Sequence, residues 1–561
     1  MSNLSVGDLT TTGTKTIVTG TSSGLNTGAL IENAVAQNNV AADKIDIKIQ
    51  ENDLLIAGYE EWYGLAQNFQ DSLFNIKSQT SILDTGNVFS QRTANLESTG
   101  SPATSLINVS IDEDAPEGSY DLVIEQKAEA FSTGSTNVVD KDADLNEVGS
   151  FTIGIDGYAA QQIDVVATDS LQDIADKINL TTADSGVSAS IVKVSETEYQ
   201  LILEGTDTNA AMTVSTLSGS VMQNLGIVDV ADTFEAGQII QNEQGSRVIY
   251  NGATITRDDN AYDDLIDGLS FDIVQADAGS TLTLDVSFDS SSAKDAILDF
   301  VDSYNAFREF AILNQQVNAD GSIPEEAILF SDTLLDSFNY QISTLLAGAS
   351  GDGLANSLRG LGIEFDGDNR LVVKDGTKLD DALLSDFENV ANFFATDVSI
   401  DNDEFRLISN TSSTESLDFT IDITTDVDGN ITAATVGGSS VFTINGNSLV
   451  GQAGTVYEGL TFAYAGTTDT SINVTMNAGV ADLLYNTIEN YTAADGSIQD
   501  EITALNAENE DYTEEAQEIR DKGEEIREEQ IQVYAAMEAE LARLDSLLNT
   551  VRALLGNNND D

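Results

Sequence analysis

Apolar residues recur at every seventh position between residues 479 and 555. One set is Ile498, Leu505, Tyr512, Ile519, Ile526 and Val533, and interleaved positions hold Ile502, Ala516, Met537, Leu544 and Val551. A sustained period of seven predicts a long helix with one apolar seam, as in a coiled coil. From Ile498 to Leu555 it would run about 85 Å at roughly 1.5 Å per residue, which is too long for burial in one globular core. A partner must therefore cover part of the seam.

A second seam lies near the other end of the chain, where apolar residues alternate four and three apart from Leu55 to Ile76. The two seams can belong to independent amphipathic helices, or the two ends can pair and leave everything between them as an insertion. We predict that the paired ends form a helical leg. The residues expected in its packing or oligomerisation are Leu55, Tyr59, Trp62, Phe69, Leu73, Ile76, Ile519, Ile526, Val533 and Met537.

Composition excludes several classes of function. The 561 residues include neither Cys nor His, which removes disulfides, thiolate chemistry, imidazole bases and most zinc or iron sites. The formal net charge of −72, from 95 acidic and 23 basic side chains, argues against binding to nucleic acid or to anionic lipid. We expect no enzymatic activity and no cofactor. The acidic surface is typical of a protein that stays soluble in a salty medium.

The N-terminal residues Met1 to Thr16 lack the basic start and apolar core of a signal peptide. No run of residues approaches eighteen apolar positions, so no membrane insertion is expected. The sequence predicts a cytosolic protein, or one that leaves the cell by a route that reads no cleaved signal.

The period of the apolar pattern changes along the chain and predicts an α+β multidomain fold, in which long terminal coiled-coil helices carry inserted mainly-β head domains. Asn26 is the expected N-cap of a short helix at 29–40, and the following leg helix is expected to end near Thr80. The expected domains are a disordered and short-helix segment at 1–42, a leg helix and connection at 43–100, β-rich head domains at 101–288, a helical leg or core domain at 289–400, an additional β module at 401–478 and the long C-terminal coiled-coil helix at 479–561.

An internal repeat is suggested by three pairs of short matches that keep their order. The pairs start at Glu198 and Glu404, at Val248 and Phe442, and at Asp267 and Glu458. They predict two similar β modules, near 198–288 and 404–477. Chance similarity is the alternative, because Asn-Gly, which occurs in one pair, is common in hairpin turns.

Motifs that could carry chemistry are few. No Ser or Cys nucleophile can have a His partner, and acidic residues are so numerous that no carboxylate pair stands out as a glycosidase site. The acidic turns at Asp366 and Asp426 offer oxygen ligands for calcium. Neither has a twelve-residue loop closed by Glu, so ordinary hairpin turns are the favoured interpretation.

Six segments carry recognisable short motifs, at 23–26 (Ser-Gly-Leu-Asn), 116–122, 171–179 with 199–207, 251–268, 300–305, and 361–371 with 379–394. Each is a weak motif alone. Together they cover most of the chain, and in this order they resemble the bacterial flagellar filament cap protein family, FliD, also called flagellar hook-associated protein 2. Asp is more usual than Asn26 at the fourth position of the first motif.

The resemblance implies a non-enzymatic protein in which terminal helices form a leg and β domains form a plate. It implies a homo-oligomeric ring of about five or six copies at the filament tip, outside the cell, after export through the flagellar type III system. The implied partners are flagellin, the hook–filament junction protein and a flagellar export chaperone. The residues expected to contact filament subunits are Leu25, Leu30, Ile31, Leu541, Leu544, Leu548, Val551 and Leu555.

The sequence departs from the family pattern in its strong acidity and in the β module at 404–477, which puts subunit count and head arrangement in doubt. Two other functions stay open. A flagellin or hook–filament junction protein also combines terminal helices with a β insertion. A surface adhesin would explain the acidity and the β modules, although not heptads at both ends, and adhesion could coexist with capping.

Overall fold

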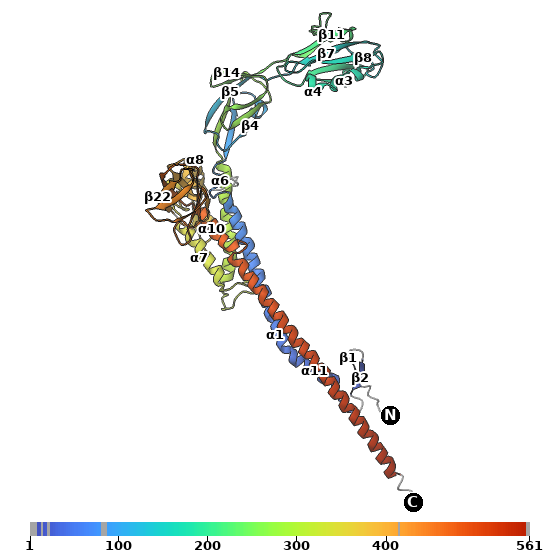
Figure 1. Ribbon diagram of the computed structural model, residues 1–561, viewed down its shortest axis with the longest axis vertical. Helices are drawn as coiled ribbons and strands as arrows, with labels where there is room; N and C mark the ends of the chain where they lie inside the picture. Colours follow the sequence, from blue (N-terminus) through green and yellow to red (C-terminus); the bar gives the residue numbers. More distant parts are fainter. Residues whose placement is uncertain are drawn as a thin grey trace. The chain divides into compact units, whose positions relative to one another are not determined.

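A computed structural model of the chain describes residues 8–12, 15–19, 23–79, 87–412, 414 and 416–556 (Figure 1). The chain divides into two compact units, which we call the leg unit (Met1–Asn87 with Ser291–Asp561) and the head unit (Val88–Ser290). Long helices at both ends and several β-sheets between them confirm the α+β multidomain fold expected from the sequence.

Two helices near the chain ends dominate the leg unit, α1 (Thr27–Phe74) and α11 (Ser497–Gly556). They lie side by side and antiparallel, so the two seams do pair (Figure 1). The Asn26 side chain caps α1 by accepting a hydrogen bond from the Ala29 amide at 2.9 Å. Pairing of the ends therefore leaves the residues between them as an insertion.

The N-terminal region differs from the expectation in three ways. α1 crosses residues 42 and 43 without a break, because the seam begins at Ile31 and Val35 rather than at Leu55. The helix ends at Phe74, whereas Thr80 lies outside the described residues. A hairpin of β1 (Asp8–Thr12) and β2 (Lys15–Thr19) occupies part of the segment that was expected to be disordered.

Shorter helices surround the C-terminal half of α1. They are α6 (Ser290–Gln315), α7 (Thr333–Gly348), α8 (Gly376–Ser385), α9 (Phe387–Phe394) and α10 (Val480–Thr492), with the 3₁₀ turn η1 (Gly353–Ala355) and the hairpin β18 (Ile363–Phe365)–β19 (Leu371–Val373). Asp332 caps α7 through the Leu335 amide. Of these helices, α6, α7 and α10 contact aromatic residues of α1, so this end of the long helix is buried.

The head unit contains a β-sandwich that we call the first sandwich. Its sheets have the orders β14-β13-β5-β17-β3 and β15-β16-β4. Alternating residues of both sheets form one core, which includes Leu122, Val248, Phe271 and Leu284. The strands are β3 (Arg92–Ser98), β4 (Ile107–Ile111, after the short α2, Ala103–Leu106), β5 (Gly118–Gln126), β13 (Ser246–Tyr250), β14 (Ala253–Arg257), β15 (Ala261–Ile266), β16 (Leu269–Ile273) and β17 (Leu282–Phe288).

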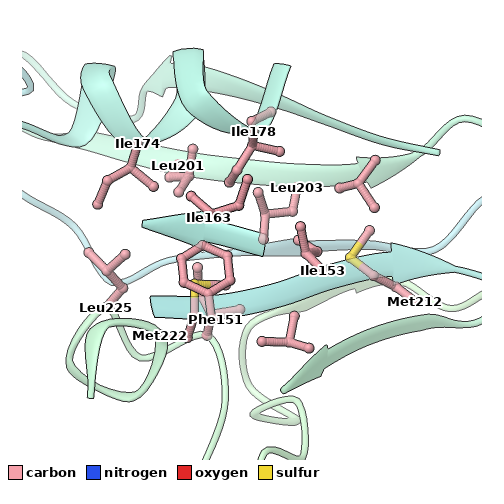
Figure 2. Close-up of a cluster of buried hydrophobic side chains, with 14 of the residues drawn as sticks. Phe151, Ile153, Ile163, Ile174, Ile178, Leu201, Leu203, Met212, Met222 and Leu225 are labelled. Carbon is pink, nitrogen blue, oxygen red and sulfur yellow. The ribbon is translucent and has the colours of Figure 1, made fainter. Parts of the chain in front are cut away.

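A second domain, the inserted head domain, lies in the chain between β5 and β13. Its sheets have the orders β12-β6-β10-β9 and β11-β7-β8, and α3 (Leu171–Asn179) covers the core (Figure 2). A capping box begins α3, since the Ser170 hydroxyl and the Asp173 carboxylate each accept the other's amide. The other elements are β6 (Ser132–Gly134), β7 (Gly149–Ile155), β8 (Gln161–Val165), α4 (Thr182–Ser185), β9 (Val187–Lys193), β10 (Tyr199–Gly205), β11 (Met212–Ser218), α5 (Val221–Asn224) and β12 (Ile239–Gln241).

The leg unit carries a sandwich of its own, the second sandwich, with the sheet orders β20-β27-β22-β23 and β21-β26-β25-β24. Its core contains Phe405, Phe419, Phe462 and Ile472. The strands are β20 (Asp397–Ile400), β21 (Phe405–Asn410), β22 (Ser416–Thr425), β23 (Ile431–Val436), β24 (Phe442–Asn445), β25 (Ser448–Gly451), β26 (Leu460–Tyr464) and β27 (Thr470–Asn477).

The two sandwiches share one topology. β17 lies between β3 and β5 as β27 lies between β20 and β22, and β16 lies beside β4 as β26 lies beside β21. Equivalent main-chain bonds close both, from the Asp112 amide to the Gly268 carbonyl and from the Thr411 amide to the Gly459 carbonyl, each 2.8 Å. The two sandwiches differ at β14, which pairs with β13 whereas β24 pairs with β25, and in one connection. β5 and β13 are separated by the inserted head domain, whereas β22 and β23 are joined by a short turn.

This topology corrects the expected repeat. The strand that starts near Glu198 is β10 of the inserted head domain, and the counterpart of β21 is β4. Asn251-Gly252 forms the loop between β13 and β14, whereas the loop between β24 and β25 is one residue later along the match. Alternating apolar residues and Asn-Gly turns occur in many hairpins, so neither identifies a particular strand. The third match does coincide with equivalent strands, β16 and β26.

Candidate assembly surface: the helical leg

The upper part of the leg is held by an aromatic cluster around Trp62 of α1, which is fully buried. The Trp62 ring lies 5.5 Å from that of Phe338 in α7 and 6.2 Å from that of Tyr491 in α10, between ring centroids. Two turns further along, the Phe69 ring lies 6.0 Å from that of Phe300 in α6. Aromatic pairs at these distances add to the burial energy of the rings. The cluster therefore fixes one end of α1 to three other helices.

Buried polar groups complete this end of the leg. The Asp482 carboxylate in α10 accepts hydrogen bonds from the Ser78 amide (3.0 Å) and hydroxyl (2.6 Å) and from the Thr396 amide (2.8 Å). Burial raises the pKa of Asp482 despite these donors. The Tyr59 hydroxyl donates to Asp332 at 2.5 Å, and burial together with that carboxylate raises the pKa of Tyr59. Asp482 thus ties the exit of α1 and the entry to the second sandwich to the start of α10.

Below the aromatic cluster, α1 and α11 contact each other in two apolar zones. The middle zone has Ala42, Ile45 and Ala516 at its centre, with Ile49, Tyr512 and Ile519 packed against them. The lower zone has Ile31, Val35 and Ile531 at its centre, with Tyr534 packed against them. Both helices contribute to each zone, as expected of a coiled-coil seam.

Ion pairs and hydrogen bonds flank the seam. Arg527 pairs with Glu32 and Arg520 with Asp46, and the Glu538 carboxylate accepts the Ser23 amide at 3.2 Å. The Arg527 guanidinium lowers the pKa of Glu32. The side chains of Glu32 and Asp46 are 63% and 40% exposed, so these two ion pairs contribute little to the stability of the leg. Their main effect is to favour the pairing of α1 with α11 in this register.

Most of the residues predicted for leg packing are buried or partly buried. Val533, however, is 58% exposed, and the next residue, Tyr534, packs in the seam instead. A straight helix drifts by about 20° per heptad relative to a strict period of seven, so the seam moves by one residue after Gly523. Of the others, Tyr59, Trp62, Phe69, Leu73 and Ile76 (which follows the end of α1) are buried, and Leu55, Ile519, Ile526 and Met537 are partly buried.

The residues predicted to contact the filament lie at the free end of the leg. Ile31 is only 2% exposed, because it packs against Val35 and Ile531, so it does not lie on the exposed surface with the other predicted residues. Residues 542–554 of α11 are all exposed. Leu547 and Leu554 belong to the same open stretch and were missed. Leu25, Leu30, Leu544, Leu548 and Val551 are exposed, Leu541 is partly buried, and the side chain of Leu555 is outside the described residues.

Sequence reasoning also missed the N-terminal half of the α1 seam. Ile31, Val35, Ala42, Ile45 and Ile49 are three, four or seven residues apart, so the seam pattern is present in the sequence. It was hidden because Asn residues occupy the intervening seam positions and Ala contributes little hydrophobicity. A search that admitted small and polar residues at single seam positions would have found it.

The acidic turns considered for calcium form hairpin turns. Asp366 accepts the amides of Asp368 (2.8 Å) and Arg370 (2.9 Å), and Asp426 does the same with Asp428 and Asn430 (2.9 Å each). The Arg370 amide lowers the pKa of Asp366, and the Asn430 side chain, together with its amide, lowers the pKa of Asp426. Within the described ranges, no group of three or more acidic side chains is arranged to hold a metal ion.

None of the helices in the described part of the chain has the length and apolar content needed to cross a membrane.

Three family models match the chain. They are flagellar hook-associated protein 2 N-terminus at residues 23–130, flagellin hook IN motif at 150–207, and flagellar hook-associated protein 2 C-terminus at 244–546. The second match falls within the inserted head domain, from β7 to just beyond β10.

Individual proteins of known name match this chain at about one quarter sequence identity. B-type flagellar hook-associated protein 2 of Pseudomonas aeruginosa is 25% identical over 351 residues, covering 59% of this chain and 72% of that protein. Flagellar hook-associated protein 2 of Escherichia coli K12 is 24% identical over 389 residues, covering 67% and 80%. The crystal structure of the D1-D2-D3 domains of the Escherichia coli flagellar cap protein FliD matches with 22% identity and a TM-score of 0.44, covering 60% of this chain and 90% of that one. The C-terminal family model alone spans more than half of the 561 residues, and the chain therefore belongs to the flagellar hook-associated protein 2 family.

Proposed function

We propose that this chain caps the distal end of a bacterial flagellar filament. Copies assemble into a closed ring, of about five or six by family resemblance, that promotes folding and polymerisation of flagellin and prevents loss of its monomers. Family membership supports the cap role. The role is structural, without catalysis, and the second sandwich adds to the plate that the ring forms.

The observation that carries the contact with the filament is the open end of α11. Its apolar residues beyond Leu541 share one broad face and are about half exposed or more, from Leu544 at 47% to Leu554 at 67%. An open apolar helix face of this length marks a site of protein contact. Arg543, Arg552 and a single Asp545 also give residues 541–556 a net positive charge in a chain of −72. We assign Leu541, Leu544, Leu548, Val551 and Leu555, together with Leu25 and Leu30, to the contact with flagellin.

Further partners and the location follow from the family. We assign the protein to the outside of the cell, at the tip of the flagellum. It reaches that place through the flagellar type III export system, accompanied by an export chaperone. Before the filament grows, the ring rests on the hook–filament junction protein.

The contact is tested with Leu544→Glu and Leu548→Glu combined. The matched control is Ser546→Glu with Asn549→Glu, which adds the same charge to exposed residues on the opposite face of α11. Co-sedimentation with flagellar filaments and release of flagellin monomers into the medium are measured. We expect the first variant to lose filament binding and to leave flagellin unpolymerised, while the control caps normally. Normal capping by both variants would rule out this contact.

Solution mass separates the cap from a flagellin-like protein. A cap predicts discrete rings of a few copies for the full-length chain. Open filaments of this chain alone would overturn the proposal in favour of a flagellin-like role, and a monomer at all concentrations would overturn it in favour of a surface adhesin.

A further inference from the structure

We infer that the leg opens in two steps, because a polar layer at Asn38, Asn39 and Gly523 separates its lower part from the rest. The lower leg comprises residues 27–37 of α1 and 524–541 of α11. The inference about opening rests on the leg alone, and only its use at the filament rests on the proposed function.

The polar layer interrupts the apolar seam completely. The Asn38 side-chain amide donates to the main-chain carbonyl of Ile519 at 2.7 Å and to the Asn39 side chain at 3.2 Å. Gly523 faces them, and a Cβ atom added there would lie 2.6 Å from the Asn39 side-chain oxygen. No apolar side chain thus joins the helices at this level. Gly also weakens a helix interior, and Asn in a seam costs stability.

The two sides of the layer are held very differently. Above it lie the middle zone around Ala42, Ile45 and Ala516 and then the aromatic cluster, where α1 also contacts α6, α7 and α10. Below it, the lower zone around Ile31 and Ile531 is the one apolar cluster among the described residues. Exposed ion pairs, the Ser23–Glu538 contact and the β1–β2 hairpin, whose strands contact α1 and α11, supplement it. Segments with few buried apolar contacts open first, so separation begins in the lower leg and stops at Asn38.

Opening has a consequence for contact with a partner. It uncovers Ile31, Val35, Ile531 and Tyr534, which are buried or partly buried in the closed leg. On α11, Tyr534 and Leu541 lie one heptad apart and connect this newly uncovered surface to the open face that begins at Leu544. Under the proposed function, the partner that takes this enlarged face is an apolar helix of a filament subunit.

Hydrogen–deuterium exchange of the full-length protein, followed by mass spectrometry, tests the opening. We expect peptides from 525–541 and from 27–37 to exchange together, and faster than peptides from 505–520. Asn38→Leu combined with Gly523→Ala should slow exchange in the lower leg by about fivefold or more, because it fills the layer and strengthens the helix. The matched control is Gly64→Ala in α1, where an added Cβ meets nothing within 4 Å. Equal exchange rates on both sides of the layer would overturn the inference.

A reversible disulfide tests the opening of the lower leg without substituting the polar layer. The chain has no Cys, so Val35→Cys with Ile531→Cys creates one possible disulfide across the lower zone. Oxidation should suppress exchange in the lower leg only, and reduction should restore it. If oxidation changes nothing in the lower leg, the segment was not opening.

Filament binding by the disulfide-linked protein tests whether opening of the lower leg contributes to contact with the filament. We expect the oxidised form to bind filaments more weakly than its reduced form. Equal binding by the two forms would refute the use of opening at the filament while leaving the two-step leg intact. Failure of the unsubstituted protein to bind filaments would instead refute the proposed function.

Discussion

Phe338 of α7 is the residue at which the leg can be broken most selectively. Its ring centroid lies 5.5 Å from Trp62, 4.9 Å from Phe307 and 4.8 Å from Tyr491, so one side chain joins α1, α6, α7 and α10. Phe338 is fully buried, and truncation of a buried Phe to Ala costs about 3–5 kcal/mol through lost burial and the cavity that remains. We expect Phe338→Ala to lower the free energy of unfolding of the leg unit by that amount.

The assay is built into the sequence, because Trp62 is the only tryptophan and contacts the substituted side chain. Its fluorescence during denaturant unfolding therefore reports the leg unit and not the head unit. The control is Tyr340→Ala on the same helix, which is 71% exposed and should change stability by no more than about 0.5 kcal/mol. A loss below about 1 kcal/mol for Phe338→Ala would show that the aromatic cluster does not hold the upper leg.

Three further predictions concern pH, salt and backbone strain. Bonds from Ser280, Ser101 and the Gly279 amide lower the pKa of Asp277 from 3.8 to about 2, so its contribution to stability is present above pH 3.8 and is lost as the pH falls toward 2. Acid unfolding of Asp277→Asn, followed by circular dichroism, should lack that component. The melting temperature should rise from low to molar NaCl, because salt screens the repulsion within a chain of charge −72, and a flat profile would contradict this. Gly268→Ala should cost about 1–3 kcal/mol in denaturant unfolding, since its φ is +68° and a Cβ would lie 2.7 Å from the Ala115 nitrogen; Gly252→Ala (φ +83°, with nothing within 4 Å) isolates the cost of the dihedral angle.

The leg could be predicted from the sequence to the extent that its seam follows regular spacing. Trp62 and Phe69 lie in such a region, and both are buried. The pairing of α1 with α11 was one of two open readings, because spacing describes one helix at a time and carries no information on its partner. Val533 and Ile31 were misplaced because the course of a seam depends on helix drift and on what the opposite helix presents at each level.

The heads were harder to predict because strand patterns are generic. Alternating residues correctly predicted β-strands, including those around Leu201 and Leu284. They could not show that these two residues belong to different cores, since strand partners are selected by contacts far apart in the sequence. Only the turn at Gly268 and Gly459, where both main chains take positive φ, marked truly equivalent positions.

The related topology of the two sandwiches shows where a protein of this kind can accept an additional domain. At one hairpin the first sandwich accommodates a complete domain, while the second closes the same hairpin with the turn 426–430. The ends of two paired strands are always neighbours, so a guest domain whose termini lie close together leaves the host sheet undisturbed. Val427, at the tip of that turn, is fully exposed. The turn 426–430 of the second sandwich is therefore a suitable insertion site. A peptide or small domain inserted in this turn would be displayed by each copy of the assembly without altering the leg.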